Sequence, residues 1–278
     1  MSGPDRHTLD GVEVDAVPPA FALQGYGVYT TFVAVDGSVL GWSRHLDRLA
    51  RGTRELWDHE LDRAEVGRLV REHLRARPGA ASVRVTAYPA RLDLHDPAAA
   101  AGCRVLVSSG PAAWPPAPTT PGLAVRSVEH ARELAHLKAT HLLTQVRLRR
   151  EAQLAGYDDA LLTTGLTTGL TTGARVLEGV TWSVLVWRGE EVATPDGGDL
   201  LDSVTVAALL EVATGLGRRP VRRPVRLAEL VEADLVLAVN VHHPARPVVR
   251  LDEHELAVDQ DLLAAVADGF GALPRDLV

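Results

Sequence analysis

Lysine is almost absent from this chain of 278 residues, because Lys138 is the only lysine among 29 basic residues. Arginine can replace lysine wherever a fixed positive charge is enough, but it stays protonated and cannot act as an amine nucleophile. A lysine can shift its pKa and form a Schiff base. Lys138 is therefore a candidate covalent catalyst, and chance survival on the surface is the alternative interpretation.

Cysteine is equally scarce, since Cys103 is the only one and no intrachain disulfide can form. It lies in the apolar run 103–107, which predicts a strand with a buried structural thiol. The chain has no uncharged apolar run of about 18 residues, as a membrane span requires. Its first residues also lack the pattern of a signal peptide. We therefore expect a cytoplasmic protein that does not contact membranes.

Positive charge is limited as well, because the net charge is −7 and the one basic patch is short, Arg218–Arg223. This composition argues against a nucleic-acid partner. No histidine or cysteine pattern has metal-ligand spacing, so we expect no metal. A dinucleotide fingerprint is also absent, since Gly25–Gly27 precedes a predicted strand rather than a helix.

The first half of the chain alternates strand and helix signals. The β-branched and aromatic run 28–35 predicts a strand, and Asp36–Gly37 predicts a hairpin turn. Ser43 is the expected N-cap of one helix, and Asp62 is the expected N-cap of a second. Further strands are expected at 83–88 and 103–108.

Residues 110–122 contain five prolines and no helical or strand periodicity, which predicts an extended linker. We expect a small N-terminal α+β domain at 1–112, the linker at 113–122 and a larger, β-rich C-terminal domain at 123–278. The fold class expected from this order is α+β in two domains.

The second half begins with a strand at 123–126 and a loop that carries Lys138. A helix is expected from Thr140 to about Leu154, and Asp202 is the expected N-cap of another helix. Short strands are expected at 159–163, 175–178, 182–187, 191–193 and 236–241. The segment 162–173 repeats Leu-Thr-Thr-Gly three times, which indicates an expanded hairpin tip rather than a solenoid.

Several motifs occur in an order typical of one family. Gly25–Thr31, Asp36–Gly37 and His45–Leu49 resemble the N-terminal domain of the class IV, or fold type IV, pyridoxal-phosphate enzymes. That family includes branched-chain and D-amino-acid aminotransferases and aminodeoxychorismate lyases. The resemblance continues through later segments: Leu137–Thr140, Glu151–Ala152, Gly156–Leu162, Val176–Gly179, Thr194–Pro195, Leu200–Thr205, Glu232–Asp234 and Pro247–Val248.

The resemblance implies a role for each matching residue. Lys138 would bind pyridoxal 5′-phosphate as a Schiff base, and Glu178 would pair with its pyridine nitrogen. Arg48 would contact the phosphate, with Val204 and Thr205 adding backbone N–H groups at a helix N-terminus. Without the resemblance, Arg48 and Glu178 have ordinary surface interpretations.

The chain also departs from the family pattern. Trp182 and Ser183 stand where the family usually has a small residue and asparagine, Ser203 replaces a glycine, and Val206 replaces an arginine. These changes make the substrate pocket the least defined part of the site. Its candidate residues are Tyr29, Thr31, Arg91, Trp182, His242 and His243.

Three functions remain open at this point. The first is an aminotransferase that acts on an amino acid and a 2-oxo acid. The second is a lyase of the aminodeoxychorismate type, which releases pyruvate. The third is a degenerate paralogue without catalysis. The resemblance also implies a homodimer.

Overall fold

The computed structural model describes residues 6–14, 25–75, 78–165, 173–196 and 200–278. It contains two compact units. The N-terminal unit comprises Met1–Trp114, Leu137–His141 and Pro274–Val278, and the C-terminal unit comprises Pro115–His136 and Leu142–Leu273. Lys138, which the sequence places in the C-terminal domain, is therefore grouped with the N-terminal unit. The expected domain boundary at 113–122 stays a prediction.

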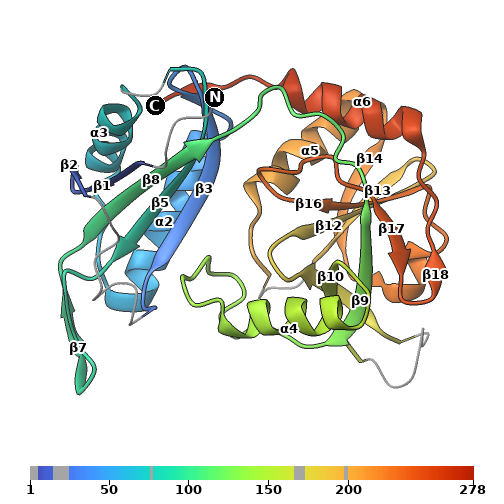
Figure 1. Cartoon of the computed structure of the whole chain (residues 1–278), viewed down its shortest axis with the longest axis horizontal. Helices are drawn as coiled ribbons and strands as arrows, with labels where there is room; N and C mark the ends of the chain where they lie inside the picture. Colours follow the sequence, from blue (N-terminus) through green and yellow to red (C-terminus); the bar gives the residue numbers. More distant parts are fainter. Residues whose placement is uncertain (1–5, 15–24, 76–77, 166–172, 197–199) are drawn as a thin grey trace. The chain divides into compact units, whose positions relative to one another are not determined.

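A seven-stranded antiparallel sheet forms the N-terminal unit, in the order β19-β4-β3-β5-β8-β1-β2. A separate two-stranded sheet, β6-β7, extends from it (Figure 1). The strands are β1 (Arg6–Leu9), β2 (Val12–Glu13), β3 (Val28–Val35), β4 (Ser38–Val39), β5 (Ala80–Tyr88), β6 (Arg91–Asp93), β7 (Asp96–Ala101), β8 (Arg104–Pro111) and β19 (Asp276–Leu277).

Two helices, α2 (Trp42–Trp57) and α3 (Arg63–Leu74), pack on one face of this sheet. Alternate β3 residues point toward α2, because side chains in a strand alternate between faces. Phe32, for example, contacts the rings of Trp42 and His45. Tyr29 and Thr31 therefore lie on the face of the sheet away from the helices.

The turns and caps of this unit follow the sequence in two of three places. Asp36 and Gly37 both have positive φ angles, 46° and 77°, which confirms the predicted hairpin turn. Asp62 caps α3 by accepting a hydrogen bond from the Glu65 N–H, as predicted. The predicted cap at Ser43 is wrong, because α2 begins at Trp42 and its N-cap is Gly41 with φ 65°.

Two sheets form the C-terminal unit, with six and four strands. Their facing side chains share one apolar core that includes Val125, Leu161, Val184 and Val236. The first sheet has the order β15-β11-β10-β9-β17-β18 and the second β14-β13-β12-β16. The strands are β9 (Leu123–Glu129), β10 (Asp159–Thr164), β11 (Arg175–Gly179), β12 (Ser183–Arg188), β13 (Glu191–Pro195), β14 (Arg219–Arg223), β15 (Val225–Arg226), β16 (Leu235–Val239), β17 (Val248–Leu251) and β18 (His254–Glu255).

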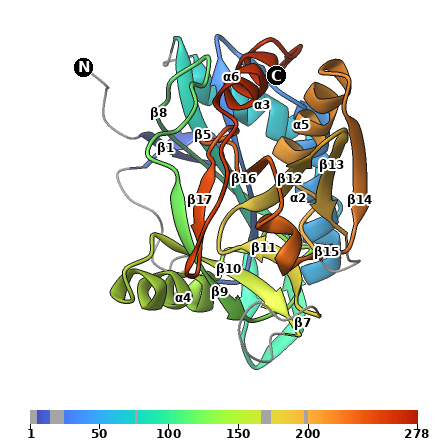
Figure 2. The same ribbon diagram turned by 90° about the vertical axis from the view of Figure 1, so that its right-hand side faces the viewer.

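The helices of this unit are α4 (Leu143–Leu154), α5 (Val204–Gly215) and α6 (Gln260–Gly271), with a short 3-10 helix at Leu227–Leu230. Figures 1 and 2 both show α4 beside β10, and α5 packs against α6. The predicted start of α4 at Thr140 is wrong, because the backbone of Thr140 hydrogen-bonds to Gly27 instead of entering the helix.

The mixture of helices and mainly antiparallel sheets confirms the expected α+β class. Most of the triple Leu-Thr-Thr-Gly segment, 166–172, lies outside the described residues. None of the helices in the described ranges is long and apolar enough to cross a bilayer.

Gly52 provides a test of how closely α2 approaches β3. A Cβ atom at Gly52 would lie 2.6 Å from Cγ1 of Val28, too close for a real contact. We expect Gly52→Ala to lower the free energy of unfolding by about 1–3 kcal/mol, the cost of overpacking a core. Chemical denaturation measures this loss. The control is Gly215→Ala in α5, where a Cβ meets no atom within 4 Å and stability should not fall.

Candidate active site

The backbone around Lys138 completes the free edge of β3. β4 pairs only with Ala34 and Val35, so the start of β3 has unpaired groups on that side. Ala139 forms an antiparallel bridge with Val28. The Tyr29 N–H donates to the Lys138 carbonyl at 2.8 Å, and the Thr140 N–H donates to the Gly27 carbonyl at 2.9 Å. Lys138 is thus held at the sheet edge by the hydrogen bonds of a short strand.

The Lys138 side chain extends over an aromatic ring. Its Nζ lies 4.9 Å from the ring centroid of Tyr29, which is itself only 9% exposed. Lys138 is half-buried. The structure therefore argues against the interpretation that Lys138 is a surface lysine retained by chance. A half-buried amine at a fixed position is the arrangement that covalent amine catalysis needs.

Arg84 is a second cation on the same ring, and sequence reasoning missed it. It lies on β5 opposite Thr31, and its guanidinium carbon is 3.7 Å from the Tyr29 ring centroid. Burial lowers the pKa of Arg84 from its usual value. No hydrogen bond or ion pair joins its guanidinium to any residue that the structure describes. A half-buried cation without a carboxylate partner among the described residues is suited to bind an anionic ligand.

Arg91, the arginine that the sequence favours for the substrate, lies elsewhere. It is exposed on β6 and donates to the Ala99 carbonyl at 3.1 Å. The only sequence signal for Arg84 is its position within a strand of small and β-branched residues, between Val83 and Val85. Its stacking on Tyr29 depends on the pairing of β3 with β5, which the sequence does not specify.

Arg48 lies on the opposite face of the sheet from Tyr29, between α2 and β3. Its Nη2 donates to the Thr30 hydroxyl at 2.5 Å, and that hydroxyl is 2.7 Å from Nδ1 of His45. Arg48 is 9% exposed, so the surface interpretation of this residue does not hold. A buried guanidinium oriented by a hydroxyl is typical of an anion site.

Glu178, at the end of β11, forms a buried ion pair that the sequence did not reveal. Nε of Arg132 lies 2.6 Å from Oε1 of Glu178, with side-chain exposures of 13% and 9%. Arg132 also donates to the Ala135 carbonyl at 2.8 Å, which fixes its orientation. The guanidinium offsets part of the charge of the Glu178 carboxylate. Arg132 lies six residues before Lys138, and this spacing is the one sequence feature that could have drawn attention to it.

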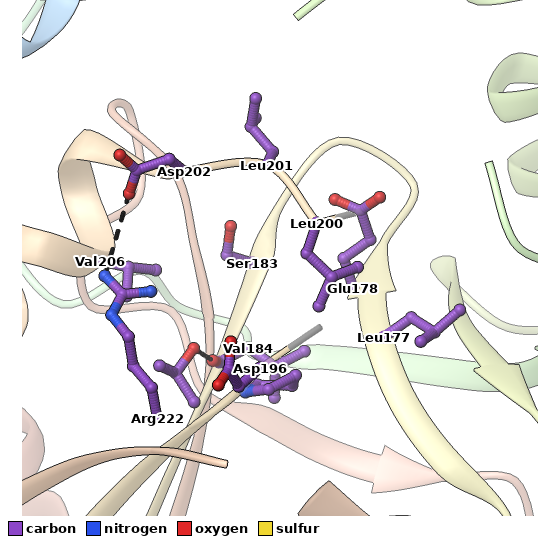
Figure 3. Close-up of a pocket in the computed structure, with 12 residues that line it drawn as sticks. Leu177, Glu178, Ser183, Val184, Asp196, Leu200, Leu201, Asp202, Val206 and Arg222 are labelled. Atoms are coloured by element: carbon purple, nitrogen blue, oxygen red, sulfur yellow. Dashed lines mark hydrogen bonds and ion pairs between the residues drawn. The ribbon is translucent and has the colours of Figure 1, made fainter. Parts of the chain in front are cut away.

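A cavity of about 100 Å³ lies between Glu178 and the start of α5 (Figure 3). The residues that line it are Leu177, Glu178, Ser183, Val184, Thr194, Pro195, Asp196, Leu200, Leu201, Asp202, Val206 and Arg222. The carboxylate of Asp202 faces Arg222 at 4.0 Å across this space. The cavity therefore lies between the carboxylate of Glu178 and the N-terminus of α5, which carries a partial positive charge.

The N-cap of α5 is Ser203, and the predicted cap at Asp202 is wrong. The Ser203 hydroxyl accepts from the Val206 N–H at 3.3 Å. The N–H groups of Val204 and Thr205 have no acceptor among the described residues, as expected for the first turn of a helix. They remain available to an anion. The serine that replaces the family's glycine thus caps the helix.

Trp182 lies in the apolar core of the C-terminal unit and not on the cavity wall. It is 5% exposed, and its indole N–H donates to the Asp159 carboxylate at 2.9 Å. Arg149 also donates to that carboxylate, at 2.8 Å. A Cβ atom at Gly179 would lie 1.9 Å from the Trp182 ring. Trp182 therefore packs on the Gly179 backbone, directly after Glu178.

His242 and His243 form a turn after β16. Both backbone N–H groups donate to the Asn240 side-chain oxygen, at 2.9 and 3.0 Å. His243 Nδ1 lies 3.0 Å from the Thr119 hydroxyl, and burial lowers the pKa of His243. In the described residues no group of three His, Cys, Asp or Glu side chains could hold a metal ion.

Comparison with known proteins identifies the family. The family model for amino-transferase class IV matches residues 27–251. A probable branched-chain-amino-acid aminotransferase of Synechocystis sp. is 26% identical over 121 residues. That match covers 43% of this chain and 37% of the relative, so the chain spans little more than a third of the curated relative that it matches.

Solved structures share the fold over nearly the whole chain. Branched-chain aminotransferases from Thermoproteus uzoniensis, with norvaline, and from Escherichia coli each reach a TM-score of 0.81, at 20% and 17% identity. Each match covers 97% of this chain and 94% of the other. The fold IV transaminase CpuTA1 from Curtobacterium pusillum reaches 0.80 at 21% identity, covering 98% of this chain and all of that one.

The fold is thus that of the fold type IV transaminases. The chain belongs to the amino-transferase class IV family. Both the family and the fold predicted from the sequence are confirmed.

The Arg132–Glu178 ion pair can be tested without any ligand. We expect Arg132→Met to lower the free energy of unfolding by about 3 kcal/mol, because it removes the cation 2.6 Å from a buried carboxylate oxygen. Glu178→Gln combined with Arg132→Met should cost less than the sum of the single changes. Urea denaturation of the four proteins measures the coupling. Simple additivity would contradict the pairing, and Arg54→Met, which breaks an exposed pair with Glu60, is the control.

Proposed function

We propose that this protein is a pyridoxal-phosphate-dependent aminotransferase that moves an amino group between an amino acid and a 2-oxo acid. The observation that carries the proposal is the placement of Lys138. The only lysine of the chain is half-buried, held by backbone hydrogen bonds at the edge of β3, and shares the Tyr29 ring with Arg84, which has no carboxylate partner among the described residues. Membership of the class IV family supports the same reaction.

The residues present fit pyridoxal phosphate, whose ring stabilises negative charge at the substrate Cα when it is bound. Lys138 would supply the amine that holds the cofactor, and would carry a proton to and from the substrate Cα. Arg132 orients the Glu178 carboxylate through their ion pair, so that this carboxylate could hold a protonated pyridine nitrogen. The family resemblance that led to this cofactor is supported by the match to the family model.

The phosphate would be held by two kinds of donor. Val204 and Thr205 offer free backbone N–H groups at the N-terminus of α5, where the helix dipole favours negative charge. Arg48 offers a buried guanidinium. Asp202 bears the same sign as a phosphate, but Arg222 faces its carboxylate and offsets part of that charge.

The substrate is bound through its carboxylate in this proposal. Every amino acid and every 2-oxo acid carries one, and Arg84 is the half-buried cation beside Lys138 that lacks a carboxylate partner among the described residues. Tyr29 and Thr31 point from β3 to the same face of the sheet. We assign them to the substrate pocket with Arg84, in preference to Arg91.

The other two functions considered from the sequence have less support. The relatives matched here are aminotransferases, and none of the residues described favours the release of pyruvate. A degenerate paralogue would have no need for the buried Arg132–Glu178 pair beside the cavity. We further propose a homodimer, on the family resemblance. We also propose a cytoplasmic location, on the composition of the sequence, and residues 113–122 as the link between the two domains of the chain.

The visible absorption spectrum tests the cofactor and the lysine together. Purified protein mixed with pyridoxal phosphate should show a visible band that borohydride reduces irreversibly, and Lys138→Ala and Lys138→Arg should lose the reducible adduct. An amino-acid donor should convert the band to that of the aminated cofactor, and a 2-oxo acid should restore it. A reducible adduct that survives in Lys138→Arg would disprove the assignment. Pyruvate release without an acceptor would favour the lyase.

Steady-state kinetics tests Arg84. Arg84→Leu removes a charge-assisted hydrogen bond to the substrate carboxylate, worth about 1.5–3 kcal/mol, so kcat/KM should fall about tenfold or more. The reducible adduct with pyridoxal phosphate should remain. Arg91→Leu is the matched control, because Arg91 is exposed on β6 and should leave kcat/KM nearly unchanged. The reverse pattern would return the substrate site to Arg91.

A further inference from the structure

We propose that Thr30 and His45 are positioning residues that orient the guanidinium of Arg48 toward the cofactor phosphate. The inference rests on the proposed function, in which Arg48 binds that phosphate. The three side chains form a buried hydrogen-bonded relay within the N-terminal unit, and nothing in the family match assigns a role to Thr30 or His45.

The relay follows from the packing of α2 on β3. His45 and Arg48 are three residues apart on α2 and therefore lie on one face of that helix. Thr30 is on the face of β3 that meets α2, next in the strand to Tyr29 on the other face. The exposures of Thr30, His45 and Arg48 are 0%, 3% and 9%. Water therefore does not compete for the hydroxyl that links the other two.

The donor and acceptor of each hydrogen bond follow from Arg48, which stands at one end of the relay and can only donate. Arginine has only donors, so the 2.5 Å contact from Arg48 Nη2 makes the Thr30 oxygen an acceptor. The hydroxyl hydrogen is then free to donate to His45 Nδ1, 2.7 Å away. His45 must accept at Nδ1, which places its proton on Nε2, where the imidazole N–H can donate to the Leu40 carbonyl.

The neutral state of His45 that this scheme requires agrees with its surroundings. Burial, followed by the charges of Arg48 and Lys138, lowers the pKa of His45 well below its usual value. Nη2 of Arg48 is only 3.4 Å from His45 Nδ1, so a protonated imidazole would face a guanidinium directly. The relay is thus intact near neutral pH, with His45 as an acceptor.

The consequence for Arg48 is a fixed direction. A guanidinium is planar, so fixing one terminal nitrogen fixes where its remaining N–H groups point. An anion that binds a guanidinium already oriented pays less conformational entropy than one that must order a mobile side chain. The relay should therefore strengthen binding of the phosphate group specifically, and leave the rest of the cofactor unaffected.

The test compares two ligands that differ only in the phosphate. The dissociation constants of pyridoxal phosphate and of pyridoxal are measured on the cofactor-free full chain, by absorbance titration. Thr30→Val should weaken pyridoxal phosphate about tenfold, the scale of a hydrogen bond to a charged group. It should change pyridoxal less than about twofold. His45→Leu should behave like Thr30→Val. Thr30→Ser, which keeps the hydroxyl, and His45→Asn, which keeps an acceptor near Nδ1, should retain the phosphate preference.

A second buried threonine–histidine pair in the same unit provides the matched control. Thr8 Oγ1 lies 2.8 Å from His73 Nδ1, and both residues are buried, at 2% and 1% exposure. This pair differs from Thr30–His45 in that Arg6 donates to the backbone carbonyl of His73 and not to the threonine hydroxyl. Thr8→Val should cost stability, as Thr30→Val does, without changing the preference for pyridoxal phosphate over pyridoxal. An equal loss of that preference in Thr8→Val would reduce the relay to a general structural effect and overturn the proposal.

Arg48→Met separates the two levels of the argument. If Arg48→Met keeps the wild-type preference, the phosphate role of Arg48 fails, and the relay proposal fails with it. If Arg48→Met loses the preference while Thr30→Val and His45→Leu keep it, Arg48 binds phosphate and only the relay is wrong. Circular dichroism checks that each variant is folded. Should Thr30→Val not fold, the comparison of His45→Leu with His45→Asn decides the outcome.

Discussion

The pairing of residues 138–140 with the free edge of β3 is the constraint on which the rest of the site depends. Backbone hydrogen bonds have strict geometry, so this pairing fixes the Cα of Lys138 relative to Tyr29 more tightly than a loop could. The edge is open only because β4 is two residues long and pairs at the far end of β3. A longer β4 would occupy the positions that Ala139 now uses. The short hairpin at Asp36–Gly37 is thus a requirement of the site and not merely a convenient turn.

The proposed site residues of the two units differ in their buried charges. In the N-terminal unit, Arg48, Arg84 and Lys138 are cations that are buried or half-buried, and Arg84 has no carboxylate partner among the described residues. In the C-terminal unit, the buried carboxylate of Glu178 is paired with Arg132. Burying a cation without a partner costs free energy unless a ligand supplies the opposite charge. Arg84 therefore gains from an anionic ligand, such as a carboxylate.

The sequence predicts those parts of the site that depend on chemistry, and misses those that depend on three-dimensional contact. Lys138 stands out because arginine, the abundant cation of this chain, cannot form a Schiff base. The turn at Asp36–Gly37 stands out because few residue types tolerate a positive φ angle. Arg84 could not be predicted, because its stacking on Tyr29 is set by strand pairing. Asp202 and Ser203 are comparable N-caps by residue type, and only the path of the chain decides which of the two caps α5.

The grouping of Lys138 with the N-terminal unit makes that unit discontinuous along the chain, since it is built from three separate segments. No single cut in the gene can therefore release an N-terminal domain that keeps both its lysine and the strand β19 at Asp276–Leu277. Recombination between relatives at the proline-rich segment would pair the β3 edge of one parent with the lysine strand of the other. In such a chimera the β3 edge and the lysine strand would come from different parents, and they would not have been selected together. Single-crossover exchange of domains is disfavoured by the path of the chain itself.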